Sequence, residues 1–211
     1  MTRKRIVIAT GVIVVVILSV GVFSWYTTSP NTHYRLGLEY QRKGMYAKAV
    51  LEFHRVIELD PSHGRAWVGL GTAYARRGMY DRAIEELQEG LNRNPAYADL
   101  WYTLGMVYLD RGYYQEAAKE LQEALRLAPH QLKEGIHFNL AYALSQVGLI
   151  DQAIREYHAG LVIDSTAVDP HLSLAALYIK REKYEEAAAE YQAVLSLKAG
   201  EYRAMNGLGT A

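Results

Sequence analysis

The stretch RRGMYDRAIEEL, residues 76–87, repeats RKGMYAKAVLEF, residues 42–53. A third version, DRGYYQEAAKEL, begins at Asp110, as far beyond Arg76 as Arg76 is beyond Arg42. In each version a glycine precedes an alanine and a large apolar residue that lie four positions apart, the spacing of one helix face. A short unit that recurs with a fixed period predicts a fold built of stacked units rather than around one globular core.

The register extends over five units. The turn position holds a glycine in four of them and a glutamate in the fifth: Gly44, Gly78, Gly112, Gly148 and Glu182. Such glycines suit the left-handed conformation that ends a helix, and Pro61, Pro95 and Pro129 close the first three units. We predict five helix–turn–helix repeats in residues 31–201, at about 30–63, 64–97, 98–131, 134–167 and 168–201, with two extra residues near Leu132 and Lys133.

This pattern resembles the tetratricopeptide repeat family, from about Asn31 to Glu201. The resemblance rests on the Leu-Gly or Leu-Ala pair of each unit, the turn glycine, the small residue that follows it, and Trp67 and Trp101. It implies an all-α fold, a right-handed superhelical solenoid of paired antiparallel helices with a concave groove. The departures at Glu182 and at the two-residue insertion leave the angle between the third and fourth repeats open.

The last ten residues resemble the start of a further repeat. YRAMNGLGTA, residues 202–211, matches GRAWVGLGTA, residues 64–73, at seven of ten positions. A solenoid needs a polar terminal cap, and Leu208 is expected to be exposed if nothing follows. We therefore expect the natural polypeptide to continue beyond Ala211.

The first thirty residues predict a membrane anchor. Residues 1–5 include Arg3, Lys4 and Arg5, and residues 6–26 carry no charge and end in Trp25 and Tyr26. Twenty helical residues reach about 30 Å, the thickness of the hydrocarbon core of a bilayer. Basic residues stay cytoplasmic, and Trp and Tyr favour the interface. After a linker at 27–30, the repeats are expected to be periplasmic, on a single-pass anchor in a bacterial inner membrane.

The alternative for this segment is a cleaved signal peptide. Ser19-Val20-Gly21 offers a small-x-small cleavage site. Signal-peptide cores are usually about 7–15 residues long, whereas this apolar run continues to Trp25. The longer run favours the uncleaved anchor.

Composition excludes several function classes. The 211 residues contain 23 basic and 23 acidic side chains, so no basic excess predicts nucleic-acid binding. The chain has no cysteine, which excludes disulfides and Cys-ligated metals. It also lacks a phosphate loop, a zinc-protease motif and a nucleophile elbow. We therefore expect no enzyme activity, no cofactor, no metal and no small-molecule substrate.

Two polar patterns are interpreted as structural. His33, His137 and His171 share the repeat position of Trp67 and Trp101, and neighbouring helices lie too far apart for a shared metal, so semi-buried packing is expected. Three acidic clusters on second helices are expected on the solvated outer face: Glu85-Glu86-Glu89, Glu116-Glu120-Glu123 and Glu185-Glu186-Glu190.

The resemblance places the binding groove on recurring first-helix positions. The candidate partner-binding residues are Tyr34, Leu38, Arg42, Val68, Arg76, Tyr102, Met106, Leu109, Phe138, Tyr142, Leu172 and Ile179. Exposed aromatics of this kind suit a peptide or a helix from a protein partner, although each side chain could instead pack between repeats. The family's carboxylate clamp is not expected, because its places hold Tyr34, Leu38, Gly69, Asp99 and Thr103.

Three functions are compatible with these features. The first is a membrane-anchored scaffold or accessory subunit that assembles a membrane protein complex, with partners bound by the groove and by the membrane helix. The second is a chaperone-like accessory factor for secreted or membrane clients near the translocon. The third is the docking arm of a larger protein whose C-terminal part is missing here.

Overall fold

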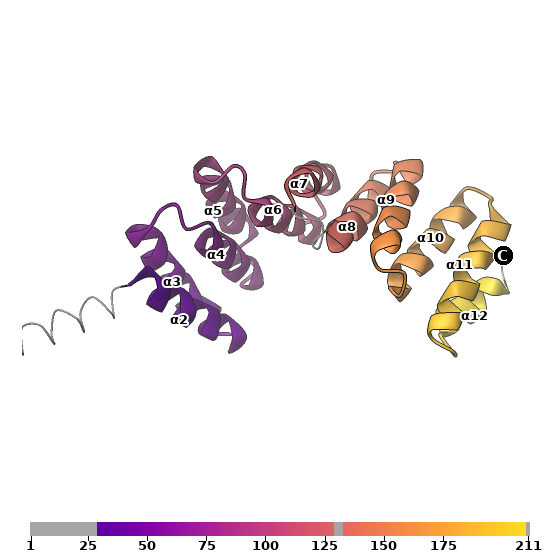
Figure 1. Cartoon of the computed structure of the whole chain (residues 1–211), viewed down its shortest axis with the longest axis horizontal. Helices are drawn as coiled ribbons and strands as arrows, with labels where there is room; N and C mark the ends of the chain where they lie inside the picture. Colours follow the sequence, from indigo (N-terminus) through magenta and orange to yellow (C-terminus); the bar gives the residue numbers. More distant parts are fainter. Residues whose placement is uncertain (1–28, 129–132, 210–211) are drawn as a thin grey trace, which may run out of the picture. The chain divides into compact units, whose positions relative to one another are not determined.

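The computed structural model describes residues 29–128 and 133–209, which form eleven α-helices. The chain consists of two compact units, divided between Pro95 and Ala96. In the described residues, the first unit contains two helix pairs (Figure 1). These are α2 (Pro30–Arg42) with α3 (Tyr46–Leu59), and α4 (Gly64–Arg76) with α5 (Tyr80–Arg93).

The described part of the second unit continues the same alternation. Its helices are α6 (Ala98–Asp110), α7 (Tyr114–Leu127), α8 (Lys133–Gln146), α9 (Ile150–Ile163), α10 (Val168–Lys180), α11 (Tyr184–Leu197) and α12 (Tyr202–Leu208). We call α2, α4, α6, α8 and α10 the first helices of the repeats, and α3, α5, α7, α9 and α11 the second helices. The all-α repeat fold expected from the sequence is therefore present in the described residues.

Each pair turns through one residue with a left-handed backbone. The φ angles are 70° at Gly44, 74° at Gly78, 74° at Gly112, 82° at Gly148 and 58° at Glu182. One residue later, the backbone N–H donates to a carbonyl oxygen of the first helix, as from Met45 to Tyr40 at 2.8 Å. This bond is typical of a helix that ends on glycine. The predicted turn positions are confirmed, and the fifth turn adopts the same backbone without a glycine.

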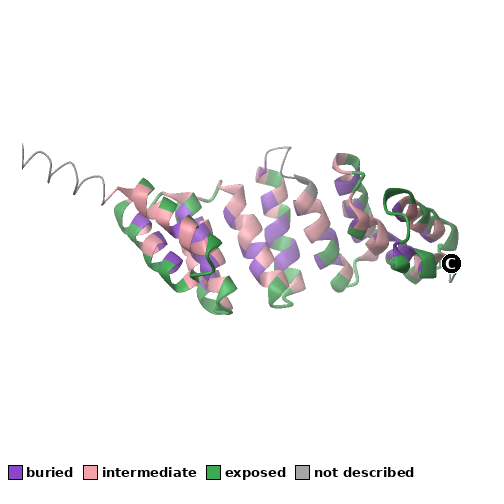
Figure 2. Cartoon of the chain, turned by 90° about the horizontal axis from the view of Figure 1, so that it is seen from below, coloured by how far each residue is buried: buried purple, intermediate pink, exposed green. Residues whose placement is uncertain are grey.

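The buried residues lie where paired helices face each other (Figure 2). In the first unit the ring of Phe53 on α3 is fully buried, and a Cβ added to Gly37 or Gly69 would lie 2.6 Å from it. These glycines let α2 and α4 approach α3 closely, because any larger residue would overlap the ring. The core of the second unit is mostly leucine, alanine and valine, including Leu104, Leu121, Leu140 and Leu174.

Three histidines bind glutamates across the helix pairs. Nδ1 lies 2.6 Å from Glu52 Oε2 at His33, 2.7 Å from Glu156 Oε2 at His137, and 2.5 Å from Glu190 Oε2 at His171. Each pair joins a first helix to the second helix of the same repeat. The histidines are partly buried, as predicted, and their side chains have glutamate partners that were not foreseen.

One of the expected solvated acids is buried, so that prediction was wrong. Glu120 is only 8% exposed, and its Oε2 has no hydrogen-bond partner in the protein. It occupies the second-helix position at which Glu156 and Glu190 meet histidines, so it faces the first helix of its own repeat. Glu190 was also expected on the solvated face, but it is partly buried against His171. The remaining acids of the three clusters are exposed or partly exposed: Glu85, Glu86, Glu89, Glu116, Glu123, Glu185 and Glu186.

The short helix α12 packs on α11, because the ring of Tyr191 lies where a Cβ on Gly207 would be. Glu201, just before α12, accepts hydrogen bonds from Lys198 Nζ at 2.7 Å and Arg203 Nε at 3.0 Å. These two cations lower the pKa of Glu201 to about 2. Leu208 was expected to be exposed and is instead half-buried.

The predicted anchor at residues 6–26, with Arg3, Lys4, Arg5, Trp25 and Tyr26, lies outside the described residues. Within residues 29–128 and 133–209, no helix combines the length and the apolar character needed to cross a bilayer.

Candidate functional site

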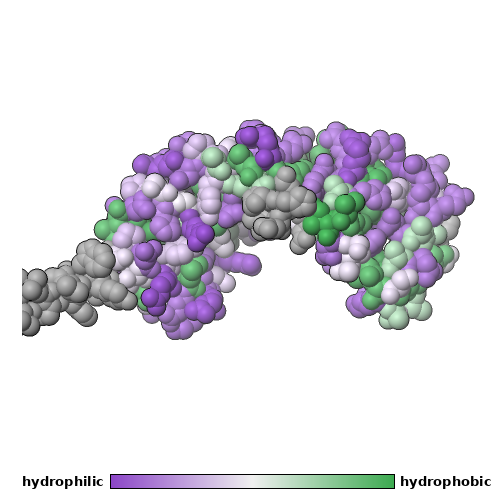
Figure 3. Space-filling view, in the orientation of Figure 1, coloured by the Kyte–Doolittle hydropathy of each residue, from purple (hydrophilic) through white to green (hydrophobic). Residues whose placement is uncertain are grey.

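The twelve candidate residues all belong to first helices, and none of them is fully buried. We call their side of the first helices the groove face and treat it separately in each unit. Its two parts differ in character (Figure 3). Hydrophilic residues gather over the C-terminal ends of α2 and α4, whereas a hydrophobic patch lies over α8.

In the first unit, the groove face combines arginines with small apolar surfaces. Leu38 on α2 is 38% exposed, Val68 on α4 is half-buried, and Arg42 and Arg76 at the helix ends are exposed. Arg42 follows Leu38 by four residues and Arg76 follows Val68 by eight, spacings that keep each pair on one side of its helix. Gln41 Nε2 donates to the carbonyl oxygen of Gly69 at 3.1 Å and ties the two helices together along this face.

Tyr34, the remaining candidate of the first unit, is partly used for packing. Its ring centroid lies 6.0 Å from that of Phe53 and 5.0 Å from that of His63. His63 in turn accepts a hydrogen bond from the N–H of Ala66 and caps the start of α4. Tyr34 therefore supports the turn between the first two repeats as well as contributing to the groove face.

An open depression of about 540 Å³ lies along α2. Its lining includes Arg35, Leu36, Leu38, Glu39 and Arg42. Glu39 is the acid in this lining, and its carboxylate already accepts a hydrogen bond from Lys43 Nζ at 2.5 Å. The hydrogen bond and charge of Lys43 lower the pKa of Glu39.

In the second unit, aromatic side chains dominate the groove face. Tyr102 on α6 accepts a hydrogen bond from Asn139 Nδ2 on α8 at 3.1 Å. Burial raises the pKa of the Tyr102 hydroxyl, although the bond from Asn139 opposes this effect. The hydroxyl therefore stays protonated and joins α6 to α8, so Tyr102 has a structural partner as well as an exposed side.

Tyr142 and Phe138 on α8 differ in their surroundings. Tyr142 is 43% exposed, and its ring meets Tyr114 of α7 edge-on at a centroid distance of 6.0 Å. The ring of Phe138 covers Gly160 on α9 so closely that an added Cβ would overlap its Cε1. The Phe138 ring thus packs between α8 and α9, whereas the Tyr142 ring is accessible to solvent. The other candidates of this unit are partly exposed: Met106, Leu109, Leu172 and Ile179.

Three residues of the groove face were missed from the sequence. Arg35 and Arg65 are exposed on α2 and α4, and Asn139 holds the Tyr102 hydroxyl. The helical spacing from Leu38 to Arg35 and from Val68 to Arg65 is three residues, so the arginines could have been found from the pattern. The bond from Asn139 could not, because it depends on the contact between α6 and α8.

Models of the tetratricopeptide repeat match the chain at residues 34–91, 71–112, 98–131 and 168–200. Between them the matches cover residues 34–131 and 168–200, and both described units contain matched repeats. No curated protein matches the chain.

Solved structures with the same fold include bacterial proteins. A crystal structure of MamA is 22% identical, with a TM-score of 0.71, over 82% of this chain and 92% of that one. The Pseudomonas aeruginosa protein pilF is 21% identical, with a TM-score of 0.74, over 84% and 80%. YrrB, described as a TPR protein with an unusual peptide-binding site, is 20% identical, with a TM-score of 0.72, over 89% and 95%. At these identities the likeness concerns the fold.

Proposed function

We propose, from the tetratricopeptide repeats that this chain carries, that it is a membrane-anchored scaffold or accessory subunit. Its groove face holds a protein partner outside the cytosol and helps to assemble a membrane protein complex. The proposal assigns the chain a binding role and no catalytic step.

The observation that carries the binding role is the exposed aromatic and apolar surface of α6, α8 and α10. Tyr142 is 43% exposed, and Met106, Leu172 and Ile179 are partly exposed around it. Rigid aromatic side chains held on a helical scaffold bind with a small loss of side-chain entropy, which suits a peptide or helix partner. The peptide-binding site described for YrrB is consistent with such a role for this fold.

The observation that supports a membrane location is the uncharged run of residues 6–26 behind Arg3, Lys4 and Arg5. Under the proposal this segment spans the inner membrane once, and residues 1–5 remain in the cytoplasm. A tether raises the effective concentration of the repeats near membrane partners, so even a weak groove contact can be occupied.

Co-purification from mild detergent tests the proposal. The tagged full chain is expressed in its native cells and purified, and the proteins that co-purify with it are identified by mass spectrometry. A scaffold predicts one stoichiometric partner, retained by the wild type and reduced by Tyr142→Ala with Met106→Ala. Tyr184→Ala is the matched control, because Tyr184 is 46% exposed but lies at the start of a second helix. A spread of unrelated, weakly bound clients would instead support the chaperone-like function.

A further inference from the structure

The groove face of the first unit carries four arginines, and Glu39, whose pKa is lowered mainly by Lys43 with help from Arg42 and Arg35, is the one acid on the same helices. Arg35 and Arg42 on α2, and Arg65 and Arg76 on α4, are exposed. Among the hydrogen bonds and ion pairs of the described residues, none involves these four guanidinium groups. The single acid on these two helices, Glu39, is already bound to Lys43.

On the second helix α5 of the same unit, two exposed arginines form ion pairs. On α5, Arg82 lies 3.1 Å from Glu85, and Arg93 lies 2.8 Å from Glu89. These are exposed pairs within one helix, of a kind that contributes little to stability. Arg55 on α3 is exposed and has no ion pair among the described residues as well, so the four arginines of α2 and α4 are distinguished by lying together on the groove face and not by the lack of a partner alone.

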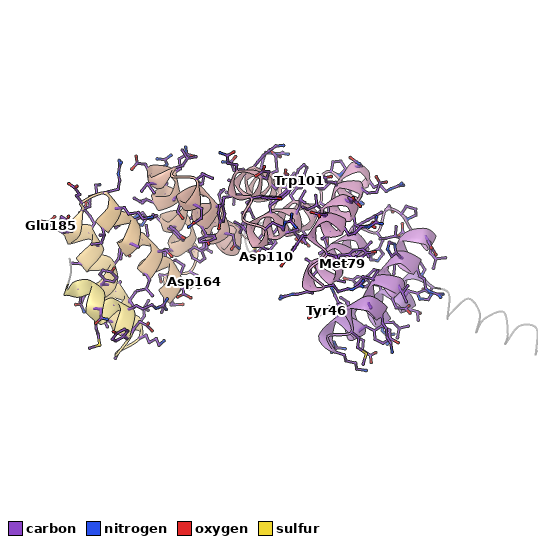
Figure 4. The ribbon with its side chains drawn as sticks, turned by 180° about the vertical axis from the view of Figure 1, so that it is seen from behind. Tyr46, Met79, Trp101, Asp110, Asp164 and Glu185 are labelled. Atoms are coloured by element: carbon purple, nitrogen blue, oxygen red, sulfur yellow. The ribbon has the colours of Figure 1, made fainter. Side chains whose placement is uncertain are left out.

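The fold does not require arginine at these positions. In the third repeat, Asp99 and Asp110 on α6 occupy the places that correspond to Arg65 and Arg76, so equivalent positions hold the opposite charge. Asp110 lies at the C-terminal end of α6 (Figure 4). Since these two repeat positions hold either charge, packing does not explain Arg65 and Arg76.

The arrangement also fits a peptide better than a simple anion. Arg35 and Arg42 lie about 10 Å apart along α2, given 1.5 Å per helical residue, with the exposed Leu38 between them. On α4, Val68 follows Arg65 by three residues and precedes Arg76 by eight. Packed helices lie about 8–10 Å apart, a span that an extended peptide covers with about three residues. The surface therefore offers alternating cationic and apolar contacts along and across two helices.

We propose that the groove face of α2 and α4 binds an acidic segment of a protein partner, with its carboxylates on Arg35, Arg42, Arg65 and Arg76 and its apolar side chains on Leu38 and Val68. Arginine forks pair with carboxylates through two parallel hydrogen bonds and remain charged at any physiological pH. This mode differs from a C-terminal carboxylate clamp, because side-chain carboxylates inside a segment are the ligands. The inference rests on the proposed scaffold function and names the chemistry of one part of the partner.

The test uses the full chain in a nonionic detergent and a fluorescent octapeptide that alternates glutamate with leucine and is amidated at its C-terminus. Fluorescence anisotropy measures its affinity beside that of the analogue with glutamine in place of glutamate. We expect the glutamate peptide to bind at least about tenfold more tightly, and rising salt to reduce this difference. Arg42→Gln with Arg76→Gln should reduce its affinity about tenfold.

Arg82→Gln with Arg93→Gln is the control, since it removes the same charge from second helices and should leave the affinity unchanged. Circular dichroism of each variant checks that the helices persist. Equal binding of the two peptides, or full binding by the Arg42 and Arg76 variant, would overturn the inference. So would tighter binding of a single-stranded oligothymidylate than of the glutamate peptide. If a partner still co-purifies through Tyr142 while the acidic peptide fails to bind, the scaffold function survives and only this inference falls.

Discussion

His137 Nδ1 on α8 lies 2.7 Å from Glu156 Oε2 on α9, a contact between residues 19 positions apart. The same spacing joins His33 to Glu52 and His171 to Glu190. The third repeat keeps the glutamate, Glu120, but has Trp101 at the histidine position. The second repeat also has a tryptophan there, Trp67, and its Glu86 is half-buried, whereas Glu120 is buried and its Oε2 remains without a hydrogen bond.

The buried Glu120 carboxylate, whose Oε1 lies 3.9 Å from Lys119 Nζ, predicts a pH-dependent gain in stability on substitution. Burial raises the pKa of Glu120 above 4.5, with a smaller opposing effect from Lys119. An acid whose pKa is raised on folding favours the folded state while both states are protonated, and this advantage is lost as the pH rises above the unfolded value. Glu120→Gln should therefore raise the stability by about 1 kcal/mol at pH 7. The gain should shrink as the pH falls below 4.5.

Urea unfolding followed by circular dichroism at pH 7 and pH 4 measures the difference. Glu116→Gln on the same helix is the control, because Glu116 is exposed and should show little change at either pH. A Glu120→Gln variant that is equally stable, or that gains the same amount at both pH values, would show that the buried charge is not the cause.

The fifth turn predicts a second stabilising substitution. Glu182 has φ of 58°, a left-handed conformation that strains a residue with a Cβ and suits glycine. Glu182→Gly should stabilise the fifth repeat by about 1 kcal/mol, after allowance for the greater freedom of glycine in the unfolded chain. Thermal unfolding of the full chain tests this.

The reverse change at the neighbouring turn supplies the comparison. Gly148 has φ of 82° and no atom within 4 Å of an added Cβ, so only backbone strain opposes Gly148→Ala. This variant should lose about 1 kcal/mol. If Glu182→Gly gives no gain in stability while Gly148→Ala gives a loss, the Glu182 side chain makes a stabilising contact that offsets its backbone strain.

The contact of Phe138 with Gly160 predicts a loss of stability from one added methyl group. In Gly160→Ala the new Cβ would overlap the Phe138 ring, so α8 and α9 must separate. Overpacking of this kind costs about 1–3 kcal/mol, partly offset by the better helix propensity of alanine. Gly135→Ala on α8 is the matched control, because nothing lies within 4 Å of its added Cβ and it should gain up to about 1 kcal/mol. Equal melting temperatures for the two variants would contradict this packing.

Much of the fold could be predicted from the chain because the repeat register carries it. The turn glycines, the helix pairs and the partial exposure of residues such as Tyr142 follow from a period that is visible in the sequence. The burial of Glu120 could not be predicted in the same way, because the acidic run of α7 has the composition of a solvated face. The constant spacing between each histidine and its glutamate was visible, but its meaning depends on how paired helices face each other.

The candidate site was harder to predict for a related reason. Period and spacing place a residue on the groove face, but they do not show whether a neighbour already uses it. Phe138 and Tyr142 lie on the same helix at helical spacing, and yet Phe138 covers Gly160 while Tyr142 remains 43% exposed. Only the tertiary contacts of α9 separate a packing residue from a residue that can meet a partner.

The absence of cysteine from the chain allows a direct test of the proposed topology. Single cysteines are introduced as Thr2→Cys before the basic triplet and as Ala47→Cys on α3, where Ala47 is exposed. In a Gram-negative host, a maleimide that cannot cross the inner membrane should label the cysteine at 47 in intact cells. It should label the cysteine at 2 only after the inner membrane is broken, because basic residues hold that end in the cytoplasm. Labelling of both positions, or of position 2 alone, in intact cells would reject an N-terminus inside and repeats in the periplasm.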